Sequence, residues 1–333
     1  MRIADMHCDT IGELLRKERE GSDVSLRHND LHLDLERMAG AGYVIQNFAL
    51  FVPISKVEDP WQELLSMEKL YREELCKNSD LIVPVTSYEE LEQNCAGGKM
   101  SAMLTVEDGG VCAGSPERLE ALYAMGVRMV TLTWNHSNEL GISAADAARG
   151  GCSSGDTHGR PGDGTASICD RNGLTKRGHE FVRRMEELGM IVDVSHLSDA
   201  GVWDLLDFAQ TPFVASHSDA RAVHNHFRNL PDELIRRIGQ KGGCIGLNFY
   251  TDFLGDEGSM AAACAHAKQI VNVGGEAVLG LGSDFDGIDT NPWIPGVQSM
   301  EKLWCALHRA GFTQRQLEKI FCENVLRLYR EIL

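Results

Sequence analysis

Short apolar segments alternate with longer amphipathic segments along most of the chain. Eight apolar segments have the length of buried strands, and the segments between them have the spacing of helices. The predicted strands lie at residues 2–9, 43–50, 101–106, 127–133, 190–194, 213–216, 244–249 and 277–281. Strands that alternate with helices are typical of an α/β protein with a parallel sheet. Eight such units favour a closed (β/α)8 barrel of the TIM type over a doubly wound sheet.

Residues 141–173 interrupt this alternation. The stretch is rich in Gly, Ser and Asp and shows neither helical nor strand periodicity. A loop of this length in a compact domain is more often a functional cover than a linker. We therefore expect one barrel domain over residues 1–333, with a long loop insertion around 141–173.

Composition narrows the classes of partner. The 333 residues carry a formal net charge of −17 and no basic stripe, which disfavours binding to nucleic acid. No apolar run is long enough to span a bilayer, and the polar motif near the N-terminus leaves no room for a signal peptide. These features predict a cytoplasmic protein with no membrane partner, and a homodimer is compatible with them. The ten cysteines form no C-x-x-C pair, which argues against a thiolate metal site.

Polar side chains follow the apolar segments at the points where the predicted strands end. The first strand ends in His7 and Asp9, and later strands are followed by Glu107, His196, His217 and Asp284. In a barrel, the C-terminal ends of the strands meet at one mouth, where catalytic groups gather. A single His at a strand end is more often structural, but five strand ends carrying zinc-type ligands are hard to attribute to chance.

This set of residues suits a two-metal hydrolytic site. Side chains two apart on a strand share one side, so Asp5, His7 and Asp9 should project together. Imidazole nitrogen and carboxylate oxygen are ligands of hydrolytic zinc sites. His7 with Asp9, and His196 with His217, could each hold one ion, with Glu107 bridging the two. Asp284 would then be free to act as general base and acid.

In order and spacing, the motifs resemble those of the membrane (renal-type) dipeptidases. These are metallopeptidases that cleave dipeptides with two zinc ions in a (β/α)8 barrel, and the resemblance is to cytoplasmic members of bacterial type. The shared motifs extend along the whole chain: Asp5-x-His7-x-Asp9, Glu107-Asp108-Gly109, Asp193-Val194-Ser195-His196, Ser216-His217-Ser218, Arg228-Asn229-Leu230-Pro231-Asp232, Asn248-Phe249-Tyr250, Gly282-Ser283-Asp284-Phe285-Asp286-Gly287 and Glu323-Asn324-Val325-Leu326-Arg327.

The resemblance implies zinc as the cofactor, two ions per chain, and a small dipeptide as the substrate. It implies that Glu107 bridges the two ions and that Asp284 handles protons. Arg228 and Tyr250 are implied to bind the substrate carboxylate or backbone. The family's substrate-contacting His has no exact counterpart, because Trp134 holds its place. Either His136, two residues further on, makes the substrate contact from a shifted loop, or the contact is lost.

Asp5 precedes the proposed ligand His7 by two residues. We expect Asp5 to orient a metal-bound His, because such imidazoles usually need a carboxylate or carbonyl partner.

The nearest rival function is another amidohydrolase-like barrel hydrolase, such as a deaminase, an N-acyl amino acid deacylase or a lactonase. Those enzymes usually begin with His-x-His and often use a carboxylated Lys bridge, whereas this chain has His-x-Asp and Glu107. A catalytically inactive binding barrel is less favoured, because all six proposed positions are intact.

Overall fold

A computed structural model describes residues 1–150 and 173–333 of the chain. The predicted cover at residues 141–173 therefore lies largely outside the described residues. Within its described part, Ala144–Ala148 forms the short helix α6, which the sequence pattern did not predict. No helix in the described ranges has both the length and the apolar content needed to cross a membrane.

Eight parallel strands of the described chain close into a ring, as predicted for a (β/α)8 barrel. Strand β2 pairs with both β1 and β4, and β1 pairs with β9, which completes the ring. The ring strands are β1 (Ile3–Asp5), β2 (Tyr43–Phe51), β4 (Met100–Glu107), β5 (Val127–Thr131), β6 (Ile191–Asp193), β7 (Val214–Ala215), β8 (Cys244–Leu247) and β9 (Leu279–Leu281). An additional strand, β3 (Ile82–Pro84), pairs with the start of β4 outside the ring. It was not predicted, since three residues are too few to show a period.

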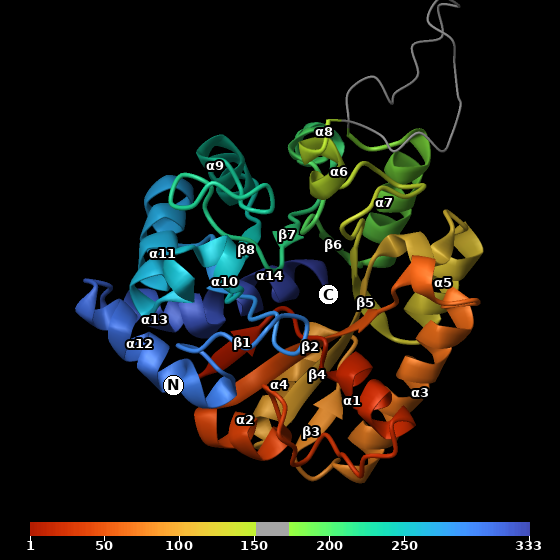
Figure 1. The fold of residues 1–333 in the computed structure, drawn as a ribbon, viewed down its shortest axis with the longest axis horizontal. Helices are drawn as coiled ribbons and strands as arrows, with labels where there is room; N and C mark the ends of the chain where they lie inside the picture. The colour runs from red at the N-terminus through yellow and green to blue at the C-terminus, as the bar shows by residue number, and fades with distance from the viewer. Residues whose placement is uncertain (151–172) are drawn as a thin grey trace, which may run out of the picture.

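Helices surround the ring (Figure 1). They are α1 (Thr10–Arg19), α2 (Leu35–Ala41), α3 (Pro60–Lys77), α4 (Tyr88–Ala96), α5 (Pro116–Ala124), α6, α7 (Lys176–Leu188), α8 (Asp199–Phe208), α9 (Asp232–Gln240), α10 (Thr251–Leu254), α11 (Met260–Gly274), α12 (Met300–Arg309), α13 (Gln314–Glu318) and α14 (Asn324–Ile332). Helix α4 begins with a capping box formed by Ser87 and Glu90. A π-helical turn, Lys319–Glu323, separates α13 from α14.

The last helix closes the lower end of the barrel. Arg327 of α14 donates to the carbonyl of Gly242, which lies just before β8. Tyr329, fully buried, donates its hydroxyl to Asn47 Oδ1 of β2 at 3.0 Å. Because α14 occupies the end where the strands begin, the side chains at their C-terminal ends face the other end, which remains available for a site.

Strand β4 changes from apolar to ionisable side chains along its inner face. On β4, the side chains of Met103, Thr105 and Glu107 lie two residues apart and therefore point to one side. Met103 packs in the interior apolar cluster with Ile45 and Met129, whereas Glu107 lies at the upper end of the strand. Strand periodicity thus places apolar packing below and ionisable groups at the mouth.

Candidate metal centre

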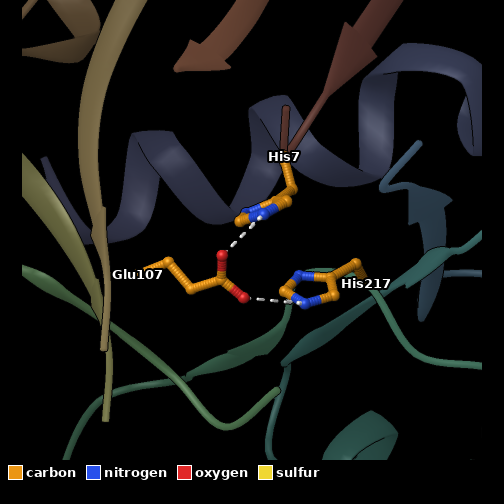
Figure 2. Close-up of side chains that lie close together, drawn as sticks. All are labelled: His7, Glu107 and His217. Carbon is orange, nitrogen blue, oxygen red and sulfur yellow. Dashed lines mark ion pairs between the residues drawn. The ribbon is translucent and has the colours of Figure 1, made fainter. Parts of the chain in front are cut away.

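The five expected metal ligands converge at the mouth of the barrel, with Glu107 in the middle. Its Oε2 lies 3.6 Å from His7 Nε2, whereas its Oε1 lies 2.9 Å from His196 Nε2 and 3.6 Å from His217 Nε2. Figure 2 shows the Glu107 carboxylate between His7 and His217, which come from different strands. Each oxygen of one carboxylate therefore faces a separate group of imidazoles, which is the arrangement that a bridging ligand needs.

Two further carboxylates complete the side of the site that contains His7. Its Nε2 lies 3.3 Å from Asp9 Oδ2 and 3.8 Å from Asp284 Oδ1. Ligand atoms of these three residues all lie within 4.8 Å of one another, as do those of His7, Glu107 and His217. Asp284 also accepts a hydrogen bond from Asn248 Nδ2 at 3.0 Å, which fixes one of its oxygens.

The burial and charge of these groups fit divalent cations. In the described chain, His7 Nδ1 and Asp9 Oδ1 are buried without a hydrogen-bond partner. Burial raises the pKa of Glu107 to about 8, and the neighbouring charge of Asp9 adds to this shift. Burial also lowers the pKa of His196 and His217 well below the usual value, so both imidazoles are neutral at neutral pH. Neutral imidazoles beside crowded carboxylates are a zinc-type donor set.

His7 differs from the other two imidazoles. Burial opposes its charge, but Asp9 and Glu107 outweigh that effect and raise its pKa well above the usual value. The two carboxylates favour a proton on His7. They also favour a metal ion beside His7, because the proton and the metal ion each bring positive charge to the site. Metal binding at this centre should therefore release a proton.

The Nδ1 atoms of His196 and His217 each have a hydrogen-bond partner. The sequence analysis gave neither partner a role. Asn135 Oδ1 lies 2.9 Å from His196 Nδ1, and Ser216 Oγ lies 2.8 Å from His217 Nδ1. The Ser216 hydroxyl donates in turn to Asp193 Oδ2 at 2.6 Å. These hydrogen bonds at Nδ1 fix both rings with Nε2 directed at Glu107. Metal-bound imidazoles are generally oriented in this way by a partner at their other nitrogen. Only the positions of Asn135 after β5 and of Ser216 after β7, each near a predicted ligand, pointed to them.

Asp5 makes a different contact from the one expected. Its Oδ1 accepts from the backbone N–H of Ser283 at 2.9 Å and from that of His7 at 3.4 Å. The carboxylate thus holds the chain at the ends of β1 and β9 and does not contact a ring nitrogen of His7. It supports the ligand through the backbone, because the Asp5 side chain turns towards the neighbouring strand.

Strained backbone conformations lie at the centre itself. Asp108, His196 and Asp284 have φ values of 74°, 69° and 61°, in the left-handed region that L residues other than Gly rarely adopt. Such conformations persist where the surrounding structure holds them, and they concentrate at functional sites. The turns at His196 and Asp284 redirect the chain after a strand and place the side chain in the cavity at the mouth.

An open cavity of about 840 Å³ extends from the centre towards α1. Ionisable groups of the centre line one part of the cavity, aromatic side chains line another, and charged residues of α1 lie at its rim. The lining residues used below are Asp9, Phe51, Glu107, Trp134, Asn135, His196, Tyr250, Phe253, Asp284, Asp286 and Gly287. A volume of this size can hold a dipeptide, since small-molecule sites usually measure about 300–1,000 Å³.

The three expected substrate contacts fall in different places. Tyr250 lines the cavity. Arg228 is buried beside it, donating to the His217 carbonyl at 3.2 Å, and lies outside the lining. His136 also lies outside the lining, with its Nε2 2.9 Å from Asp108 Oδ2. The ring of His136 pairs with Asp108, whereas Trp134 and Asn135 line the cavity, so a substrate contact by His136 stays a prediction.

Gly287 packs against two carboxylates of the centre, which gives a direct prediction. A Cβ at this position would lie 2.1 Å from Asp9 Oδ2 and 2.8 Å from Asp284 Oδ1, so Gly287→Ala must displace Asp9. We expect zinc affinity, measured by titration against a competing chelator, to fall by about 10-fold or more. Gly40→Ala is the matched control, because its added Cβ has no atom within 4 Å. Equal affinities in both variants would contradict a role for Asp9 in metal binding.

A family model described as membrane dipeptidase, peptidase family M19, matches residues 1–333. The chain belongs to the membrane dipeptidase family. It is 32% identical over 317 residues to an uncharacterized dipeptidase of Schizosaccharomyces pombe, covering 90% of this chain and 72% of that protein. It is 30% identical over 288 residues to an uncharacterized protein in the pqqA 5′ region of Klebsiella pneumoniae, covering 84% of this chain and 98% of that protein.

Solved structures agree with this membership of the membrane dipeptidase family. The crystal structure of dipeptidase AC, a metallopeptidase of family M19, superimposes with a TM-score of 0.85 at 25% identity and covers 100% of this chain and 98% of that chain. A metallopeptidase of Rhodobacter sphaeroides, bound to a phosphinate mimic of L-Ala-D-Ala, also gives a TM-score of 0.85, at 24% identity, with 100% and 99% covered. The second likeness supports the barrel fold.

Proposed function

We propose that this chain is a zinc-dependent dipeptidase that hydrolyses the peptide bond of free dipeptides at a two-metal centre. The observation that carries the proposal is the position of Glu107, whose two oxygens face His7 on one side and His196 and His217 on the other. His7 with Asp9 would hold one ion and the other two imidazoles the second. Two bound ions would supply Lewis acidity and a water acidified to a pKa of about 7.

Asp284 is the group that we propose moves the proton. Its Oδ2 is held by Asn248, while its Oδ1 faces the His7 side of the centre. Burial raises the pKa of Asp284, and the nearby charge of Asp9 contributes to the same direction. A carboxylate with a raised pKa is a stronger base, so it can accept a proton from the attacking water and return it to the leaving amine.

Arg228 is the proposed partner of the substrate carboxylate. Its guanidinium is buried, and no carboxylate among the described residues lies within ion-pair distance. Burial lowers the pKa of Arg228 to about 10, so the group is still charged at neutral pH. A buried cation whose Nε has no partner is costly unless an anion joins it. Among the described residues, no hydrogen bond or ion pair joins Arg228 to Asp232, which instead accepts from Gln269.

The rival hydrolases are less well supported. The described residues that line the cavity include no Lys that could form a carboxylated bridge, and Glu107 lies where a bridging ligand would be needed. All six positions proposed for the centre carry ionisable side chains that meet at one mouth, which does not favour an inactive binding barrel. A cytoplasmic location, a homodimer and a single barrel domain with an insertion around 141–173 stay predictions.

A screen of free dipeptides, N-acyl amino acids and lactones, run with the purified chain before and after removal of zinc by a chelator, tests the function. We expect zinc-dependent release of amino acids from dipeptides. Faster hydrolysis of the acyl amino acids or lactones than of every dipeptide would contradict the assignment. Elemental analysis of the same preparation should give two metal equivalents per chain.

A further inference from the structure

One wall of the cavity is formed by two aromatic side chains. Phe51 is the last residue of β2, and Trp134 follows β5; their ring centroids lie 4.8 Å apart. Both side chains are partly exposed and line the cavity. The Trp134 ring also lies 6.3 Å from that of His196, so this aromatic wall begins directly at the centre.

The opposite side of the mouth has a different character. Because β2 and β5 flank β4 in the ring, the aromatic wall lies on the Glu107 side. Strand β7, which precedes Arg228, is the fourth strand from β2 and thus lies across the barrel from Phe51. Arg228 stacks over Phe253, with its guanidinium carbon 5.1 Å from the ring centroid. Phe253 itself lines the cavity beside Tyr250.

This arrangement fixes the direction of a bound dipeptide. If its carboxylate pairs with Arg228 and its peptide carbonyl lies at the centre, the first residue must extend away from Arg228. That direction leads to Phe51 and Trp134. We propose that these two side chains select dipeptides whose first residue is aromatic or bulky and apolar. The inference rests on the proposed dipeptidase function and on the role given there to Arg228.

The physical basis is contact area and stacking. A large apolar side chain on the Phe51–Trp134 wall removes apolar surface from water on both partners, and an aromatic one can also stack. A glycine first residue leaves the wall exposed. At the outer rim of the cavity, Arg16 pairs with Glu13 and Glu20, and Arg19 pairs with Glu63, so both arginines that line the described part of the cavity are paired.

The experiment compares kcat/KM of the zinc-loaded enzyme on Phe-Ala, Leu-Ala, Gly-Ala, Lys-Ala and the reversed dipeptide Ala-Phe. We expect Phe-Ala to exceed Gly-Ala by about 10-fold or more, in line with the selectivity that apolar pockets reach. In Trp134→Ala this ratio should fall towards one, mainly through a higher KM for Phe-Ala, while Gly-Ala changes little. Trp293→Ala is the matched control, because Trp293 is 52% exposed and lies outside the cavity lining.

A second variant, Trp134→His, tests the same proposal in case Trp134→Ala does not fold. Trp134→His keeps a ring at the position but makes it smaller and polar, so it should lower the Phe-Ala to Gly-Ala ratio by a smaller factor. An unchanged ratio in these variants, or a wild-type preference for Lys-Ala or Ala-Phe, overturns the inference while leaving the dipeptidase function intact. Failure of the zinc-loaded enzyme to cleave any dipeptide overturns both.

Discussion

Glu107→Gln is expected to lower dipeptide hydrolysis by about 10³-fold or more, because the change removes the charge shared by both halves of the centre. The amide keeps the size of the side chain, but its NH2 group would face imidazole nitrogens or a metal ion where an acceptor is needed. Elemental analysis should show the metal content falling from two equivalents to one or none. Assays at saturating zinc, combined with that analysis, measure both effects.

The melting temperature of metal-free Glu107→Gln shows whether a loss of activity comes from lost metal binding or from a destabilised fold. Glu107 lies among the acidic groups Asp9 and Asp284, whose charges help to raise its pKa to about 8. Removing a crowded buried carboxylate should therefore leave the metal-free melting temperature unchanged or higher. Glu117→Gln, at an exposed carboxylate held by Ser115, is the matched control and should retain activity and metal. Two metal equivalents in Glu107→Gln would refute the bridging role.

Arg228→Ala and Arg228→Lys are expected to lose about 2–4 kcal/mol of transition-state stabilisation on a free dipeptide, which corresponds to a loss of about 30- to 1,000-fold in kcat/KM. The physical reason is that Arg presents a rigid fork of donors suited to a carboxylate, which Lys lacks. On the C-terminal amide of the same dipeptide, both variants should change little, because the amide has no charge to pair.

The acid-to-amide ratio is the deciding measurement for Arg228. Arg221→Ala is the matched control, since Arg221 lies in the same loop but pairs with Asp199 near the surface. Its ratio should equal that of the unmutated enzyme. If the unmutated enzyme cleaves acid and amide equally well, Arg228 does not bind the carboxylate, and its burial must serve the fold alone.

The outer partners of the imidazoles show why part of the site was beyond sequence reasoning. Asn135 contacts His196 across 61 positions of sequence, and Asp193 is linked to the His217 ring through Ser216. Polar residues after a strand are common, and nothing in their local pattern distinguishes a partner of a ligand from a solvated side chain. Trp134 is a similar case, because its pairing with Phe51 depends on which strands are neighbours in the ring.

The sequence by itself determined the barrel, because strand and helix periods are local properties that burial imposes on each segment. It also determined the candidate ligands, since His7, Glu107 and His217 each follow an apolar strand and carry zinc-type donor atoms. The tertiary structure decided which oxygen of Glu107 faces which imidazole, that Asp5 holds backbone, and that His136 pairs with Asp108. These outcomes depend on strand order, register and left-handed turns, which bring distant residues within a few ångströms and leave no periodic trace in the chain.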